Sequence, residues 1–193
     1  MPRLRPSPGY VLAAALALAT LSVGAQVGND VDGYLLTQTD LLIEELGDEA
    51  NATAVRQVGN RNSVEVIQRQ LGALPNTARV LQRGDANAAQ LVQAGYGNQV
   101  ILLQRGNRNR YTLDLAGSGN DIAVVQNGDA NEVRQRHDGA RDLTVEFIQD
   151  GDANLIDYQT DGLIQKDIAI RQDGDGLRLQ VTRTTLAAGA GGG

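Results

Sequence analysis

Asparagine recurs along this chain at steps of about eleven residues, and so short a repeat limits the possible folds more than any single motif does. A glutamine follows most of these asparagines six positions later. Each unit must be one small element that cannot bury an apolar face alone and therefore stacks on its neighbours. The repeat predicts a ladder of stacked amides made of Gln57, Asn62, Gln68, Gln82, Asn87, Gln93, Asn98, Gln104, Asn109, Asn120, Gln126, Asn131, Gln149, Asn154 and Gln172.

The segment between each asparagine and its glutamine has the pattern of a strand. Residues 98–104, for example, read Asn-Gln-Val-Ile-Leu-Leu-Gln, which is short, rich in β-branched and aliphatic residues, and alternating. The connectors between these arms contain glycine and asparagine, which tolerate positive φ, so we expect turns there. No apolar stripe at helical spacing survives the interruptions, so we expect no helix. The expected turn glycines are Gly59, Gly84, Gly106, Gly128, Gly151 and Gly174.

Alternation along each arm places asparagine, two apolar residues and glutamine on one face, which we expect to face inward. Buried amides are costly if isolated. In parallel strands about 4.8 Å apart, however, each amide can bond to the identical amide above and below it. Two arms make one layer of about 22 residues, so residues 41–183 predict an all-β, two-sheet parallel β-solenoid of about six layers. Tyr111, Phe147 and Tyr158 fall on the inner face and are expected in the core.

The first residues have the pattern of a cleavable signal peptide over residues 1–25. Arg3 and Arg5 precede an apolar run over residues 11–21, and Ala25 offers a small residue before the cut. We expect an N-terminal segment over residues 26–40 and a disordered Gly/Ala tail over residues 184–193. The formal net charge of -6 argues against nucleic acid as the main partner.

Irregularities in the repeat predict where the stack departs from regularity. The connector from residue 70 to residue 76 is long and contains Pro75, so it should bulge at an edge. Substitutions toward the C-terminus should interrupt the ladders and loosen the last layers. Leu115, His137 and Thr160 take the place of glutamine, and Asp142, Lys166 and Leu177 take the place of asparagine.

The sequence offers few candidate residues for metal binding or catalysis. Asp85, Asp129, Asp152 and Asp175 occupy equivalent turns, where they form either a cation site or a solvated column. His137 lacks a partner for catalysis or metal binding, and we expect no catalytic residue, cofactor or metal site. A carbohydrate-processing solenoid would need longer coils and inserted loops. An ice- or surface-binding solenoid would need a flat threonine array, which the threonines of this chain do not form.

The repeat unit resembles that of a known family. Residues 57–68 and 82–93 share the spacing Gln-x-Gly-x-x-Asn-x-apolar-x-x-x-Gln, which resembles the curlin repeat of bacterial curli fibres over about residues 41–183. The resemblance implies a non-enzymatic structural subunit of extracellular functional amyloid that serves adhesion and the biofilm matrix. It also implies partners: other copies of itself or a major curlin subunit, and the export and outer-membrane assembly proteins of that system, without an integral membrane span.

Within that family the chain resembles the minor, nucleating subunit more than the major one. Residues 45–57 resemble the start of the nucleator's repeat region, and residues 166–183 resemble its basic last repeat. This likeness implies surface anchoring through Lys166, Arg171, Arg178 and Arg183. Two alternatives stay open: a major fibre subunit, and a secreted β-solenoid binding module that does not polymerise because residues 26–40 and the tail mask its ends.

Overall fold

The structure is a computed structural model, and it describes residues 50–160 and 167–182. The expected signal peptide, the N-terminal segment, residues 41–49 of the repeat region and the C-terminal tail lie outside the described residues. Lys166 and Arg183, two of the four expected anchoring residues, lie outside them as well.

Every regular element in residues 50–160 and 167–182 is a strand, as the alternating arms predicted. The strands are β1 (Ala52–Val58), β2 (Ser63–Gln70), β3 (Thr77–Arg83), β4 (Ala88–Tyr96), β5 (Gln99–Arg105), β6 (Arg110–Tyr111), β7 (Leu115–Ser118), β8 (Asp121–Asn127), β9 (Asp138–Arg141), β10 (Thr144–Asp150), β11 (Leu155–Ile156), β12 (Ile168–Asp173) and β13 (Arg178–Leu179).

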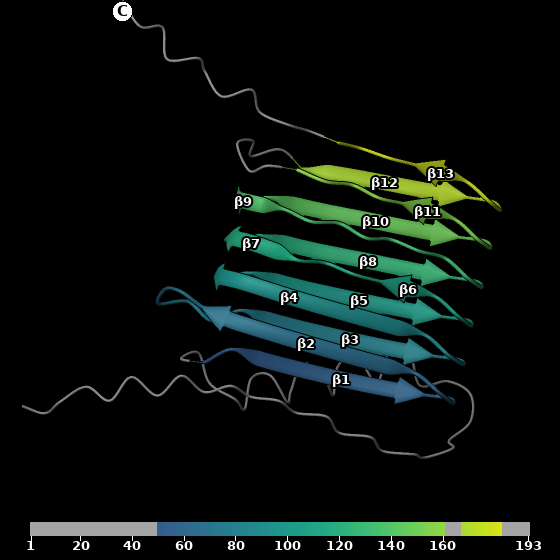
Figure 1. Ribbon diagram of the computed structural model, residues 1–193, viewed down its shortest axis with the longest axis horizontal. Coiled ribbons are helices and arrows are strands. Elements are labelled where there is room, and N and C mark those ends of the chain that lie inside the picture. The colour runs from purple at the N-terminus through teal and green to yellow at the C-terminus, as the bar shows by residue number, and fades with distance from the viewer. Residues whose placement is uncertain (1–49, 161–166, 183–193) are drawn as a thin grey trace, which may run out of the picture.

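The strands coil into a parallel β-solenoid, which confirms the predicted fold class (Figure 1). One sheet runs β1-β3-β5-β8-β10-β12, and each neighbouring pair is parallel. Strands β2, β4, β7 and β9, with β6 beside β4, form a second sheet, and β11 pairs β13. Single bridges at Glu132 connect Arg110 to Leu155 between these parts. The first sheet contains five steps from β1 to β12, so the described chain makes about five turns, against about six layers expected.

The register is set by glutamine over glutamine. Gln57, Gln82, Gln104, Gln126, Gln149 and Gln172 align in the first sheet. The interval from Gln57 to Gln82 is the longest in this column because it contains the insertion before Asn76. Leu71 and Leu74 in that insertion are 74% and 59% exposed, so the extra residues leave the stack at an edge, as predicted.

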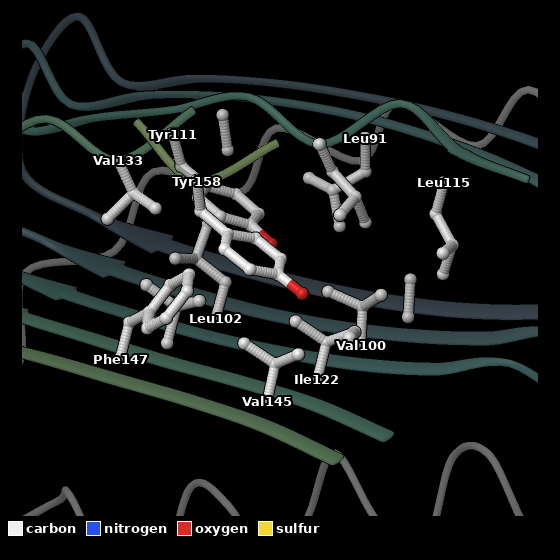
Figure 2. Close-up of a cluster of buried hydrophobic side chains, with 14 of the residues drawn as sticks. Leu91, Val100, Leu102, Tyr111, Leu115, Ile122, Val133, Val145, Phe147 and Tyr158 are labelled. Carbon is white, nitrogen blue, oxygen red and sulfur yellow. The ribbon is translucent and has the colours of Figure 1, made fainter. Parts of the chain in front are cut away.

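The core lies between the inward faces of the coils. Val100, Ile122 and Val145 come from successive strands and lie in a column, and Leu91 and Leu115 face them from the other side (Figure 2). Tyr111, Phe147 and Tyr158 are at most 2% exposed, which confirms their predicted place in the core. Burial of each such side chain contributes about 1.5–3 kcal/mol relative to leaving it in water.

One predicted position is wrong. The asparagine position after Asn120 is Leu143 and not Asp142, because the Leu143 backbone N–H donates to Asn120 Oδ1 at 3.1 Å. The cause is a register shift between β7 and β9, where Ala116 pairs Asp138 and Gly117 pairs Ala140. Gly139 is therefore an extra residue, and it lengthens this coil by one.

Candidate functional site

The candidate site is the set of side-chain columns that run along the solenoid. The longest is the glutamine column of the first sheet, which runs from Gln57 to Gln172. At each step Nε2 of one glutamine donates to Oε1 of the next, at distances of 2.7 to 3.0 Å. Gln82, Gln104, Gln126 and Gln149 have no exposed surface. The column therefore joins all six strands of this sheet through buried amides.

From Gln82 to Gln172, each glutamine of this column also reaches across the core to the opposite side of the coil. Its second N–H donates to a backbone carbonyl there, as Gln104 does to Ala88 at 3.3 Å and Gln126 does to Arg110 at 3.1 Å. Since both hydrogens and the oxygen are bonded, the amide does not incur the desolvation cost of an isolated buried polar group.

The second glutamine column is short. Gln68 Nε2 donates to Gln93 Oε1 at 2.7 Å, and the next positions are Leu115, His137 and Thr160, as the sequence predicted. The strands on this side are also shorter toward the C-terminus, where β11 and β13 have two residues each. The side that lacks the amide ladder has the less regular pairing.

The asparagines form two columns whose bonding differs from the prediction. The sequence predicted bonds between identical amides. In the structure, Oδ1 accepts the backbone N–H of the asparagine one coil later, and Nδ2 donates to a turn carbonyl, as Asn87 does to Gly106 at 2.8 Å. The reason is reach, because the short side chain meets the backbone first. Amide-to-amide bonds are added in places, as from Asn120 to Asn98 at 2.7 Å.

The columns include two residues that the expected ladder omitted. Asn76 accepts and donates like the others, and Asn51 Oδ1 accepts from the Asn76 N–H at 2.8 Å. The signal was present in the sequence, since Asn76 precedes Asn98 by one 22-residue step. The insertion before Asn76 removes it from the spacing of about eleven residues. The first column is Asn51, Asn76, Asn98 and Asn120, and the second is Asn62, Asn87, Asn109, Asn131 and Asn154.

The turn glycines form a column of their own. Gly59, Gly84, Gly106, Gly128, Gly151 and Gly174 have φ between 106° and 119°. A Cβ on any of the first five would collide with the glycine carbonyl of the following coil. Only glycine fits, both because of φ and because the backbones approach closely.

The aspartates of the turns act as hydrogen-bond acceptors between coils. Asp85 Oδ1 accepts the Asn60 backbone N–H at 2.7 Å, and Asp152 Oδ1 accepts that of Asp129 at 2.7 Å. Asp175 does the same for Asp152. Within the described ranges, no group of three or more His, Cys, Asp or Glu side chains could hold a metal ion.

The two expected anchoring residues that the structure describes differ in environment. Arg171 contacts Asp150 at 2.6 Å and Asp173 at 3.0 Å, and its hydrogen bond and charge interaction with Asp173 raise the pKa of its guanidinium. Arg178 is exposed on β13. Two carboxylates therefore neutralise the charge of Arg171.

His137 is fully buried where the ladder would have a glutamine. Its Nε2 lies 3.1 Å from Gln135 Oε1, and its ring meets the ring of Tyr158 edge-on at 5.0 Å. Burial lowers the pKa of His137 to about 4. The imidazole is therefore a neutral core group at neutral pH.

Comparison of the chain with family models, curated proteins and solved structures found no match. Within the part of the chain that the structure describes, no helix is long and apolar enough to cross a membrane.

Proposed function

We propose that this chain is a structural subunit of an extracellular curli-type fibre, and that it is the minor subunit that nucleates polymerisation at the cell surface. The proposal includes export after removal of residues 1–25 and a role in adhesion and the biofilm matrix. The partners are other copies of the chain or a major curlin subunit, together with the export and outer-membrane assembly proteins of that system. It includes no catalytic role and no cofactor. It also takes each coil to contribute one strand to each of two opposed sheets, as the paired arms of the sequence indicate.

The observation that carries the proposal is the unbroken glutamine column from Gln57 to Gln172. In-register parallel strands with buried identical amides one above another are the arrangement of cross-β fibres. Among the described strands, β1 and β12 each pair on one side only. The edge of a sheet is a template for another strand. A second subunit added at either end would continue the same ladder.

A direct experiment is to follow the secreted protein, after signal removal, by thioflavin fluorescence and fibre diffraction. We expect fibres with reflections near 4.8 Å and 10 Å. Protein that stays monomeric at high concentration over days, without the 4.8 Å reflection, would show instead a solenoid that does not polymerise.

A second experiment separates the minor from the major subunit. Sub-stoichiometric protein added to a major curlin should abolish its lag phase, and deletion of residues 167–183 should release the protein from the cell surface into the medium. A chain that forms the bulk of the fibres and remains on the cell without these residues would be a major subunit.

A further inference from the structure

Charge is distributed unevenly along the solenoid axis. Residues 50–110 contain eight arginines and two acidic residues, a net charge of +6. The described residues after position 110 contain five arginines and thirteen acidic residues, a net charge of -8. Because each coil stacks directly on the one before (Figure 1), this division in sequence is a division in space. Over the described residues, the β1 end is basic and the β12 end is acidic.

The difference in net charge is also present at the two ends of the stack, where a second subunit would bind. Two coils span about 10 Å, which is about one Debye length at 0.1 M salt. Residues 50–96 hold five arginines and two acidic residues, a net charge of +3. Residues 143–160 and 167–182 hold two arginines and seven acidic residues, a net charge of -5. Within the described ranges, the two ends therefore have opposite net charge.

The hydrogen-bonding columns match in the same orientation. In the turn column each backbone N–H donates to the side-chain oxygen one coil later, and the column starts at Asn60 and ends at Asp175. The Asp175 N–H of one copy would then face the Asn60 side chain of another, so no two carboxylates meet at the junction.

The glutamine column matches too. Gln172 donates to the carbonyls of Leu155 and Leu177, whereas each preceding glutamine donates one N–H to the next glutamine. A copy stacked on this end would offer Gln57 Oε1 in place of the Leu177 carbonyl.

We propose that copies of this chain associate in one orientation, with the acidic β12 end of one copy on the basic β1 end of the next. This inference rests on the proposed function and adds to it the polarity of the stack and the origin of that polarity. Complementary charge brings the two ends together in the correct order, and the identical ends repel each other. The one like-charged pair in the columns at this junction, Arg171 over Arg56, is offset because Asp150 and Asp173 already bind Arg171.

Charge reversal at each end tests this inference. The β1-end variant combines Arg61→Glu with Arg69→Glu, and the β12-end variant combines Glu146→Lys with Asp167→Lys, all at exposed positions. The formal net charge of -6 becomes -10 in the first variant and -2 in the second. Asp121→Lys with Asp138→Lys is the matched control, because it also gives -2 but lies in the fourth coil.

Circular dichroism first shows that each monomer is folded. The rate of seeded elongation is then measured at low ionic strength, with each protein growing on seeds of the same protein. We expect each end variant alone to elongate about tenfold more slowly than the unmodified chain. An equimolar mixture of the two should regain most of the rate, because each supplies the end that the other lacks. The control should stay within about twofold of the unmodified chain.

Three outcomes would overturn the inference while leaving fibre formation intact. A β12-end variant that elongates faster than the unmodified chain would show that overall net charge controls the rate. A mixture no faster than its components would show that the ends do not recognise each other. A faster β1-end variant would show that residues 30–49 of the same chain, with seven acidic residues and no basic one, occupy that end. An unmodified chain that forms no fibre would overturn the proposed function together with this inference.

Discussion

The position of a glutamine within its column determines how many hydrogen-bonding groups lose a partner when that glutamine is replaced. Gln104 accepts from Gln82 and donates to Gln126. Gln93 accepts from Gln68, but its neighbour on the other side is Leu115. The two residues are equally buried, so they form a matched pair.

We expect Gln104→Leu to destabilise the monomer more than Gln93→Leu does. Each buried polar group left without a partner costs about 1–3 kcal/mol. Gln104→Leu strands a donor and an acceptor of the column and should cost about 2–5 kcal/mol, whereas Gln93→Leu strands one donor and should cost about half of that. Urea unfolding followed by circular dichroism measures both. Equal losses of stability would mean that the glutamines of the column contribute by filling the core and not by their hydrogen bonds.

His137 should make stability depend on pH. Its pKa is about 4 in the folded chain against 6.5 as the ordinary value, so the unfolded chain binds a proton between these limits and the folded chain does not. Stability therefore falls as pH decreases from about 6.5 to about 4, by about 3 kcal/mol in total.

We expect His137→Gln, which restores the residue type of the ladder, to remove this contribution. The measurement is the urea midpoint at several pH values for both proteins. If the two pH profiles run parallel between pH 6.5 and pH 4, the loss of stability comes from other groups.

At the scale of the element, the turns bring successive coils so close that some of them leave no room for a Cβ. Gly106 has φ 106°, and a Cβ there would collide with the Gly128 carbonyl. Gly139 has φ 78°, but a Cβ there would meet nothing within 4 Å. The two glycines therefore separate conformational strain from close packing.

We expect Gly106→Ala to prevent the regular stacking of its coil and to yield little folded protein. Gly139→Ala should cost only the strain of positive φ, about 1 kcal/mol. Soluble yield and urea unfolding distinguish them. If Gly106→Ala is as mild as Gly139→Ala, the coils can separate at the turn without loss.

The sequence was sufficient to predict strands, turns, inward faces and parallel stacking, because each follows from a period and an alternation. The sequence was insufficient for features that depend on backbone geometry. Ala86, Ala130 and Ala153 adopt positive φ of 57° to 58°. An alanine in the sequence does not indicate such a backbone conformation. Cross-coil bonds such as that from the Ala86 N–H to the Asn60 carbonyl at 2.8 Å offset the strain. The extra Gly139 was missed for the same reason, since only the strand register reveals it.

At the scale of the whole molecule, the candidate site was predictable as residues but not as bonds. The glutamines were named from their spacing, whereas the asparagine bonds to backbone and the acceptor role of the aspartates needed the structure. The axial charge division could have been read from the sequence. It acquires meaning only once the coils are known to stack in chain order.

The C-terminal end of the second asparagine column should limit how tightly subunits join. The Leu177 N–H donates to Asn154 Oδ1 at 2.9 Å, so its backbone takes the asparagine position, but its side chain cannot continue the column. An asparagine there would offer Oδ1 to the Asn62 N–H of a second copy and Nδ2 to the Gly59 carbonyl of that copy. These correspond to the two bonds that the Asn62 side chain makes within the chain, to the Asn87 N–H and to the Gly84 carbonyl.

We therefore expect Leu177→Asn to lower the critical concentration for fibre growth at least about fivefold, since two hydrogen bonds contribute about 1–3 kcal/mol together. Leu177→Ala is the control, because it removes the same half-exposed side chain without adding an amide, and the Leu177 carbonyl remains available to Gln172. Sedimentation of fibres at equilibrium gives the critical concentration of each. If alanine lowers it as much as asparagine does, the gain comes from losing leucine, and the junction does not extend the asparagine column.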